Sequence, residues 1–432
     1  FFATPGNHDQ WSMTGKPLAK NFVDPVGNVE AYAAPGAARG KEARPCPGMR
    51  MVGYDETLPY AGQFGYRPQP SDLYWETPFG TSPDMADRRA RTAVEGGESA
   101  LISDMSYLVE PVEGLWLLSI DANVYLPNTD GGHDDCSKDG WNATVRHKPY
   151  LLHWMRDVAR RARAENKRLV AFSHYPVTDI FRGLTAELET LPSSRAGARR
   201  MPTPDVAAAI AATGIPLHFS GHWHVDATAA EAGLVNVFVP STVAYPAGWK
   251  CLEIGSGGMN ISDRAVCDAP GFDAWFARYV AEADRTGQAS SVPIAADYRQ
   301  FLDRHFRAIV LQRRLPEDWP PQMQAMARSA RLPEIADLLS LPQAGLPDIA
   351  LADILVDWYR LREAGGGAAA GVSKERRALY AELARSCAGM DFPGGSDAAI
   401  LAVFLRTLGL LLTGDDARQA ALERLREAFV PC

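Results

Sequence analysis

The sequence predicts an α/β core followed by a separate all-α domain. Between about residues 115 and 254, short apolar runs rich in β-branched and aromatic residues alternate with helical stretches and loops, which is typical of a sheet of buried strands. From residue 269 onward the pattern turns helical. At about 150 residues per domain, the 432 residues suffice for two or three domains.

Four segments are predicted to be buried strands, because each is a short apolar run bounded by Gly, Pro, Asp or His. They are LWLLSI at 115–120, LVAFS at 169–173, PLHFS at 216–220 and VNVFVP at 235–240. A helix is predicted over 149–166, where apolar residues at 151, 152, 155, 158 and 159 form one face. Trp154 and Met155 are therefore expected in the core.

Residues 10–110 have a different character. Pro and Gly are dense there, aromatic residues are frequent and helical periodicity is weak, so we expect a long insertion of loops and short strands over the core. The predicted domains are residues 1–268, which form the core with this insertion, and residues 269–432, which form the helical domain. Its predicted helices cover 272–285, 298–314, 348–364, 374–387 and 417–429.

Composition excludes several classes of protein. With 46% hydrophobic and 22% charged residues, neither a disordered chain nor a membrane bundle fits. The longest apolar stretch, 398–412, is too short to span a bilayer and contains Arg406, so a buried helix is expected there. The 44 Lys and Arg against 52 Asp and Glu give a net charge of −8, and without a long basic run nucleic acid is not an expected partner.

The six cysteines form no CxxC pair, which argues against a zinc ribbon or a thioredoxin-like centre. They are Cys46, Cys136, Cys251, Cys267, Cys387 and Cys432. Their even number permits three disulfides, with Cys251–Cys267 and Cys387–Cys432 as local pairs in an exported protein. Six buried thiols in a cytosolic protein are the alternative. We expect export, periplasmic or secreted.

Three segments place metal-binding side chains directly after an apolar run or a sharp turn: Pro5–Asp9, Phe172–Pro176 and Ser220–His224. His222 and His224 stand two residues apart, so in an extended segment both face one site. Imidazole with amide or carboxylate oxygen suits Zn, Mn and Fe. Taken singly, each segment has an ordinary explanation, as an Asx turn, a core histidine or a surface turn. All three are predicted to follow strands, where open α/β sheets place their sites.

In this order, GNHD, the isolated His of FSHYP, and GHWH resemble the calcineurin-like metallophosphoesterase superfamily, whose pattern runs DxH, GDxxD, GNH[DE], H, GHxH. The resemblance implies a four-layer αββα sandwich and two divalent ions, with Mn, Fe or Zn as the expected metals. It implies that Asn7, His174 and His222 hold one ion and that His224 contributes to the other. It also places His8 beside the leaving oxygen of the ester, oriented by Asp9.

The chain departs from that pattern at its start. Only five residues precede Gly6, and they contain neither DxH nor GDxxD, which the family uses for the other metal and for the bridging ligand. We therefore expect an N-terminally truncated form of a longer protein, with the sandwich incomplete at that end. A degenerate, catalytically inactive relative is the alternative.

The function that the resemblance implies is hydrolysis of a phosphate ester by a metal-activated water at a dinuclear site, with no covalent enzyme intermediate. The substrate is open among monoesters, diesters, nucleotides and phosphoproteins, because loops set it. Two other classes compete with this one. The first is a binding or scaffold protein that kept the sandwich, and the second is a distinct hydrolase with one metal on Asn7, His174 and His222.

Other polar residues are weaker candidates. Asp121 and Asn123 follow a predicted strand and are expected either to support the ligands from behind or to form an ordinary turn. His218 is expected in the core. The remaining candidates are His133 with Asp134 and Asp135, which suit an exposed loop better than a metal, and Tyr175, Asp226 and Tyr245, which are candidates for substrate contact without a supporting motif.

Overall fold

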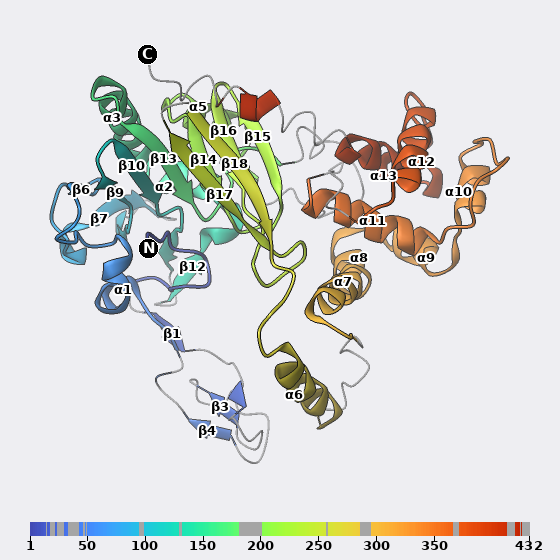
Figure 1. The fold of residues 1–432 in the computed structure, drawn as a ribbon, viewed down its shortest axis with the longest axis horizontal. Coiled ribbons are helices and arrows are strands. Elements are labelled where there is room, and N and C mark those ends of the chain that lie inside the picture. Colours follow the sequence, from blue (N-terminus) through green and yellow to red (C-terminus); the bar gives the residue numbers. More distant parts are fainter. Residues whose placement is uncertain are drawn as a thin grey trace. The chain divides into compact units, whose positions relative to one another are not determined.

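The structure is a computed structural model. It describes residues 1–13, 15–17, 22–23, 30–32, 43–45, 48, 50–94, 99–128, 132–180, 201–255, 258–285, 295–365, 371–412, 420–423 and 425. Over these residues the fold is mixed α/β with a helical C-terminal region (Figure 1), which confirms the predicted class. The helix expected at 417–429 lies largely outside the described residues.

A mixed seven-stranded sheet contains all four predicted strands, in the order β15-β16-β14-β13-β10-β9-β6. β10 and β14 both run parallel to β13, whereas β9 is antiparallel to β10 and to β6. The strands are β6 (Tyr74–Glu76), β9 (Tyr107–Val112), β10 (Leu115–Ile120), β13 (Arg168–Ser173), β14 (Leu217–Ser220), β15 (Ala227–Glu231) and β16 (Leu234–Phe238).

The three adjacent parallel strands end at one level, which fixes where polar residues can meet. Ile120 pairs with Ser173, and Ser173 pairs with Ser220. The residues that follow these strands therefore emerge together at one edge of the sheet, where polar side chains can converge.

Four helices belong to the part of the chain that carries this edge: α1 (Tyr54–Ala61), α2 (Trp141–His147), α3 (Tyr150–Ala164) and α5 (Pro204–Ala211). The helix predicted over 149–166 is α3. Its buried residues Leu151, Met155 and Val158 share a hydrophobic cluster with the strand residues Leu118 and Ala171. Burial of this apolar face confirms the helical period, and Met155 is a core residue as expected.

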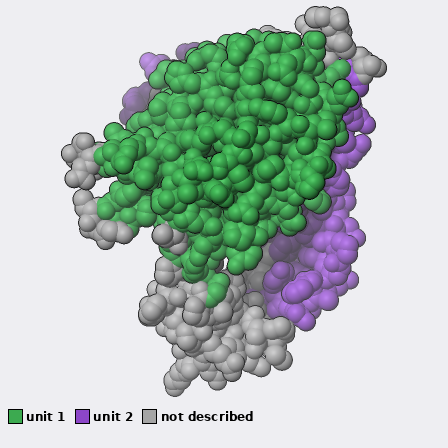
Figure 2. Space-filling model, turned by 90° about the vertical axis from the view of Figure 1, so that its left-hand side faces the viewer, with its two compact units in different colours: residues 1–177, 202–222, 231–234 green, residues 178–201, 223–230, 235–432 purple. Residues whose placement is uncertain are grey.

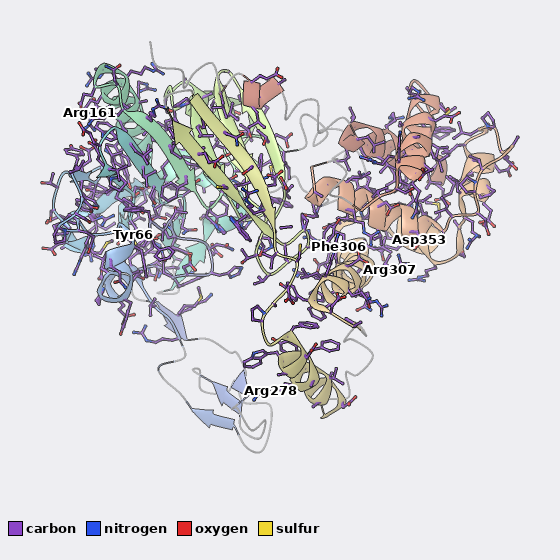
Figure 3. The ribbon with its side chains drawn as sticks, viewed as in Figure 1. Tyr66, Arg161, Arg278, Phe306, Arg307 and Asp353 are labelled. Atoms are coloured by element: carbon purple, nitrogen blue, oxygen red, sulfur yellow. The ribbon has the colours of Figure 1, made fainter. Side chains whose placement is uncertain are left out.

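Within residues 10–110 the described elements are short, as expected. They are β1 (Lys16–Pro17), β2 (Phe22–Val23), β3 (Glu30–Tyr32), β4 (Ala43–Pro45), β5 (Arg50–Met51), the 3₁₀ turns η1 (Gly62–Phe64) and η2 (Met85–Asp87), β7 (Arg89–Ala93) and β8 (Ser99–Ser103), in addition to α1 and β6. β6 also forms the edge of the main sheet. Tyr66 packs edge-on against Tyr107 of β9, with ring centroids 5.5 Å apart (Figure 3).

Two hairpins and a 3₁₀ turn complete the strand-rich part: β11 (Tyr125–Pro127) with β12 (His133–Asp135), β17 (Gly248–Gly255) with β18 (Gly258–Ala265), and η3 (Cys136–Asp139). The second hairpin shows that the expected Cys251–Cys267 disulfide was wrong. Cys251 pairs with Ser262 inside the hairpin, whereas Cys267 lies beyond the last pair, Gly248 with Ala265. At about 3.4 Å per residue, that offset exceeds the roughly 4.4–6.8 Å between Cα atoms that a disulfide requires.

The other expected disulfide partner, Cys432, lies outside the described residues, and Cys387 is a buried thiol.

The C-terminal region is helical, as predicted. Its elements are α6 (Phe272–Arg285), α7 (Tyr298–Ile309), the π-helical turn η6 (Val310–Arg314), α8 (Leu315–Asp318), α9 (Pro321–Ser329), α10 (Leu332–Leu338), α11 (Leu351–Glu363), α12 (Lys374–Ser386) and α13 (Asp397–Leu412). α13 is the buried helix expected at 398–412, and its Phe404 packs against Trp319. Arg307 of α7 and Asp353 of α11 form an ion pair at 2.7 Å (Figure 3).

The chain divides into two compact units, coloured separately in Figure 2. The first contains residues 1–177, 202–222 and 231–234, and the second contains residues 178–201, 223–230 and 235–432. Each has its own hydrophobic clusters. Among the described helices, none has both the length and the apolar character needed to cross a bilayer.

Candidate metal centre

The loop that carries Asn7 is closed by its own residues. The amide of Gly6 donates to Asp9 Oδ2 at 2.7 Å, and the amide of Asp9 donates back to the Gly6 carbonyl at 3.2 Å. This reciprocal pair makes a tight turn in which Asn7 is buried while His8 and Asp9 stay exposed. Gly6 is needed because a Cβ there would come within 3.0 Å of His174 Nδ1.

Ala3 and Thr4, which precede this loop, are hydrogen-bonded to residues of β9 and β10. Tyr107 Oη and Ser119 Oγ donate to the Ala3 carbonyl at 2.8 and 3.0 Å. Thr4 Oγ1 donates to the carbonyl of Ile120, the last residue of β10, at 3.1 Å. The start of the described chain therefore delivers Asn7 to the edge where the parallel strands end.

His174 and His222 arrive at the same edge from the sheet itself. His174 follows Ser173, the last residue of β13, and Gly221 separates His222 from the end of β14. The Gly221 amide donates to the His174 carbonyl at 3.1 Å, which continues the pairing past both strands. His222 has a φ of 65°, in the left-handed region, so the chain turns sharply here at a cost that functional sites often carry.

His174 Nε2 lies close to side-chain atoms of both Asn7 and His222. Asn7 Oδ1 lies 2.8 Å from His174 Nε2, and His222 Nδ1 lies 2.9 Å from that same nitrogen. A ring nitrogen has a single proton or a single lone pair in its plane, so it cannot make two ordinary hydrogen bonds at once. Three donor atoms held this closely are the arrangement that a shared cation would satisfy.

The spacing of these atoms fits a divalent metal. Ligands at about 2.0–2.1 Å from an ion are about 2.9 Å apart in an octahedral site and about 3.3 Å apart in a tetrahedral one, so the distances of 2.8 and 2.9 Å match octahedral geometry. Two imidazoles with an amide oxygen are a ligand set for Zn, Mn or Fe. Among the described residues, no three His, Cys, Asp or Glu side chains form a group that could hold a metal, and this cluster reaches three donors only because Asn7 supplies one.

Three further residues were expected at this site: His8, Asp9 and His224. His8 Nε2 lies 3.5 Å from Asn7 Nδ2, beside the cluster and exposed. The Asp9 carboxylate accepts from the Gly6 amide, and its expected role in orienting His8 stays a prediction. His224 falls in the second unit, where it is exposed with a φ of 57°. Within the first unit, the structure brings Asn7, His174 and His222 together.

Asp121 belongs to a buried ionic group whose other two members, Lys148 and Asp104, were not among the candidates predicted from the sequence. Lys148 Nζ pairs with Asp104 at 3.2 Å and with Asp121 at 3.3 Å, and all three side chains are fully buried. Burial lowers the pKa of Lys148, but the two carboxylates outweigh burial and raise it overall. The only signal in the sequence was a lysine next to Pro149, between two helical segments.

The two carboxylates respond differently to burial. Burial and the charge of Asp104 raise the pKa of Asp121 in spite of Lys148. For Asp104, burial also raises the pKa, but Lys148 and the hydrogen bonds from Ser106 outweigh it, so the net pKa is lowered. Asp121 forms its ion pair with Lys148. Asn123, two residues later, instead bonds the Asn7 loop, because its Nδ2 donates to the Pro5 carbonyl at 3.1 Å.

Of two weaker candidates, one is placed as expected, and for the other the expected exposed loop was wrong. His218 is buried on β14 and lies 3.0 Å from Ser173 Oγ, which confirms it as a core residue. His133 lies on the short strand β12, half-buried, rather than in a loop, and burial lowers its pKa.

No family model matches the chain, and no curated protein matches it. What supports a function is therefore the order of the motifs in the sequence and the geometry of the cluster.

Proposed function

We propose that the protein is a metal-dependent phosphoesterase of the calcineurin-like type, with the four-layer αββα sandwich as its core architecture. One observation carries the proposal. The three segments that resemble this superfamily are far apart in the sequence, yet His174 Nε2 lies 2.8 Å from Asn7 Oδ1 and 2.9 Å from His222 Nδ1.

In this proposal Asn7, His174 and His222 hold one divalent ion, and His224 contributes to a second. Bound divalent ions would supply a nucleophilic water at neutral pH and would neutralise the charge of the phosphoryl oxygens. Asn7 is buried and His174 is fixed at a strand end, so both donors are held in place before a ligand arrives. Such preorganisation is what catalysis by positioning requires.

His8 is proposed to serve the leaving group. Its exposed imidazole lies next to Asn7, with Nε2 3.5 Å from Asn7 Nδ2, so a substrate at the cluster would meet this ring from the solvent side. A proton on His8 can pass to the leaving oxygen as the ester bond breaks. General acid catalysis of this kind contributes about 10²–10⁴-fold to the rate.

The test is hydrolysis of p-nitrophenyl phosphate and bis-p-nitrophenyl phosphate with added Mn²⁺. It is run on the wild-type protein and on its His8→Ala variant. We expect Mn²⁺-dependent hydrolysis that falls about 10²–10⁴-fold in His8→Ala. His153→Ala, which removes an exposed histidine on α3, is the matched control and should leave the rate unchanged.

Absence of hydrolysis by the wild-type protein with Mn²⁺, Fe²⁺ and Zn²⁺ would overturn the enzymatic proposal. A binding or scaffold protein built on the same fold would then be the better account.

A further inference from the structure

Asn123 bonds the Asn7 loop and the histidine segment at the same time. Its side chain is buried, only 1% exposed. Nδ2 donates to the Pro5 carbonyl at 3.1 Å, and Oδ1 accepts from Tyr175 Oη at 3.2 Å. Because the Pro5 carbonyl can only accept, the orientation of the carboxamide is determined. One side chain after β10 therefore joins residues that lie 118 and 52 positions away in the sequence.

Tyr175, which donates this bond to Asn123, also contacts both imidazoles. Its ring is fully buried, with its centroid 5.1 Å from that of His174 and 4.8 Å from that of His222. Its carbonyl accepts from Ser173 Oγ at 2.9 Å and from Trp141 Nε1 at 3.2 Å, so the backbone is held as well. A fixed aromatic ring in contact with both histidines limits how far their nitrogens can move.

We propose that Asn123 is a positioning residue that, together with Tyr175, sets the separation of Asn7, His174 and His222. The inference rests on the function proposed above, because it concerns the metal that these three residues would hold. Asn123 does not itself supply a ligand. It ties the carbonyl two residues before Asn7 to the tyrosine that contacts both histidines.

Neighbouring polar residues are less suited to this role. Asp121 is engaged with Lys148 and with the amide of Met105. It reaches Asn123 only by accepting from its backbone amide at 3.1 Å, which fixes the turn after β10. Residues that orient metal ligands from behind typically contribute about 10–100-fold to metal affinity.

The experiment measures Mn²⁺ affinity by isothermal titration calorimetry and the visible absorption spectrum of the Co²⁺-loaded protein, on the full chain. We expect about 10-fold weaker Mn²⁺ binding and an altered Co²⁺ spectrum in Asn123→Ala. Tyr175→Phe keeps the ring and removes only the hydroxyl, so a smaller loss, about threefold, is expected. Asn128→Ala is the matched control, because Asn128 also makes two side-chain bonds, to Gly132 and Asp134, and should bind Mn²⁺ like the wild type.

The outcomes separate the inference from the function beneath it. If the wild type binds Mn²⁺ and both variants bind it equally well with the same Co²⁺ spectrum, the positioning role is wrong and the metal site stands. If the wild type binds no divalent metal, the proposed function fails and this inference fails with it. If Asn123→Ala does not fold, Tyr175→Phe decides, and unchanged affinity and spectrum in that variant overturn the proposal.

Discussion

Gly6 shows how a single missing side chain permits the cluster. A Cβ at this position would lie 3.0 Å from His174 Nδ1, 3.1 Å from His174 Cε1 and 3.2 Å from Asp9 Oδ2. These contacts are tighter than packed atoms normally tolerate, so the imidazole or the Asp9 carboxylate would have to shift. The position of His174 thus depends on the glycine at position 6, although Gly6 is not itself one of the proposed metal ligands.

We therefore predict that Gly6→Ala lowers Mn²⁺ affinity about tenfold, as displaced support of a ligand does, while the fold remains. Calorimetric titration measures the affinity, and circular dichroism checks the fold. Gly394→Ala is the control, because a Cβ at Gly394 would meet nothing within 4 Å. An unchanged Mn²⁺ affinity in Gly6→Ala would show that His174 can accommodate a Cβ at position 6, and it would contradict this prediction.

At this scale the sequence predicted the ligands better than their surroundings. Asn7, His174 and His222 could be chosen because their motifs have a recognisable order and each follows a strand or a turn. Asn123 was a candidate to support the ligands, but its bonds to Pro5 and Tyr175 could not be predicted, because these contacts exist only once the chain has folded.

At the scale of elements, the pairing of β10, β13 and β14 brings the site together. Their last residues, Ile120, Ser173 and Ser220, are in register. The apolar runs predicted these three strands to within one residue at each end, which is within the normal uncertainty of strand boundaries. The Cys251–Cys267 pair failed for a related reason, since proximity in sequence does not determine the register of a hairpin.

The buried ion group that joins β10 to the start of α3 makes a stability prediction. Lys148→Met leaves Asp104 and Asp121 buried without their shared cation, and breaking a buried pair in this way costs about 3–5 kcal/mol. Urea unfolding at pH 7.5 measures the loss. Lys374→Met, at an exposed lysine of α12, is the control and should leave the free energy of unfolding unchanged. A loss below about 1 kcal/mol would mean that water or another group replaces Lys148.

The same variant has a predicted pH dependence. Without Lys148, burial and mutual repulsion raise the pKa of both carboxyls above their unfolded values, as they already do for Asp121 in the wild type. A carboxyl with a raised folded pKa stabilises the fold below its unfolded pKa, and that contribution is lost as the pH rises through the folded pKa. Lys148→Met should therefore recover part of its lost stability between pH 7.5 and pH 5. A loss of stability over that range would contradict this account.

At the scale of the whole molecule, the three clustered donors all belong to the first compact unit. The sequence predicted a core followed by helices, and the helices of the C-terminal region are present. It could not predict that the chain passes between the two units several times, once between His222 and Trp223, because such a division depends on packing over the whole chain.

The central claim is that Asn7, His174 and His222 form a metal site, and a Mn²⁺ titration of the wild type and His174→Ala tests it most directly. We predict saturable binding that raises the free energy of unfolding, by about 2.7 kcal/mol at a free Mn²⁺ concentration of 100 Kd. His174→Ala should bind at least about 100-fold more weakly, and His153→Ala should bind like the wild type. No binding by the wild type, or equal binding by His174→Ala, would contradict the account.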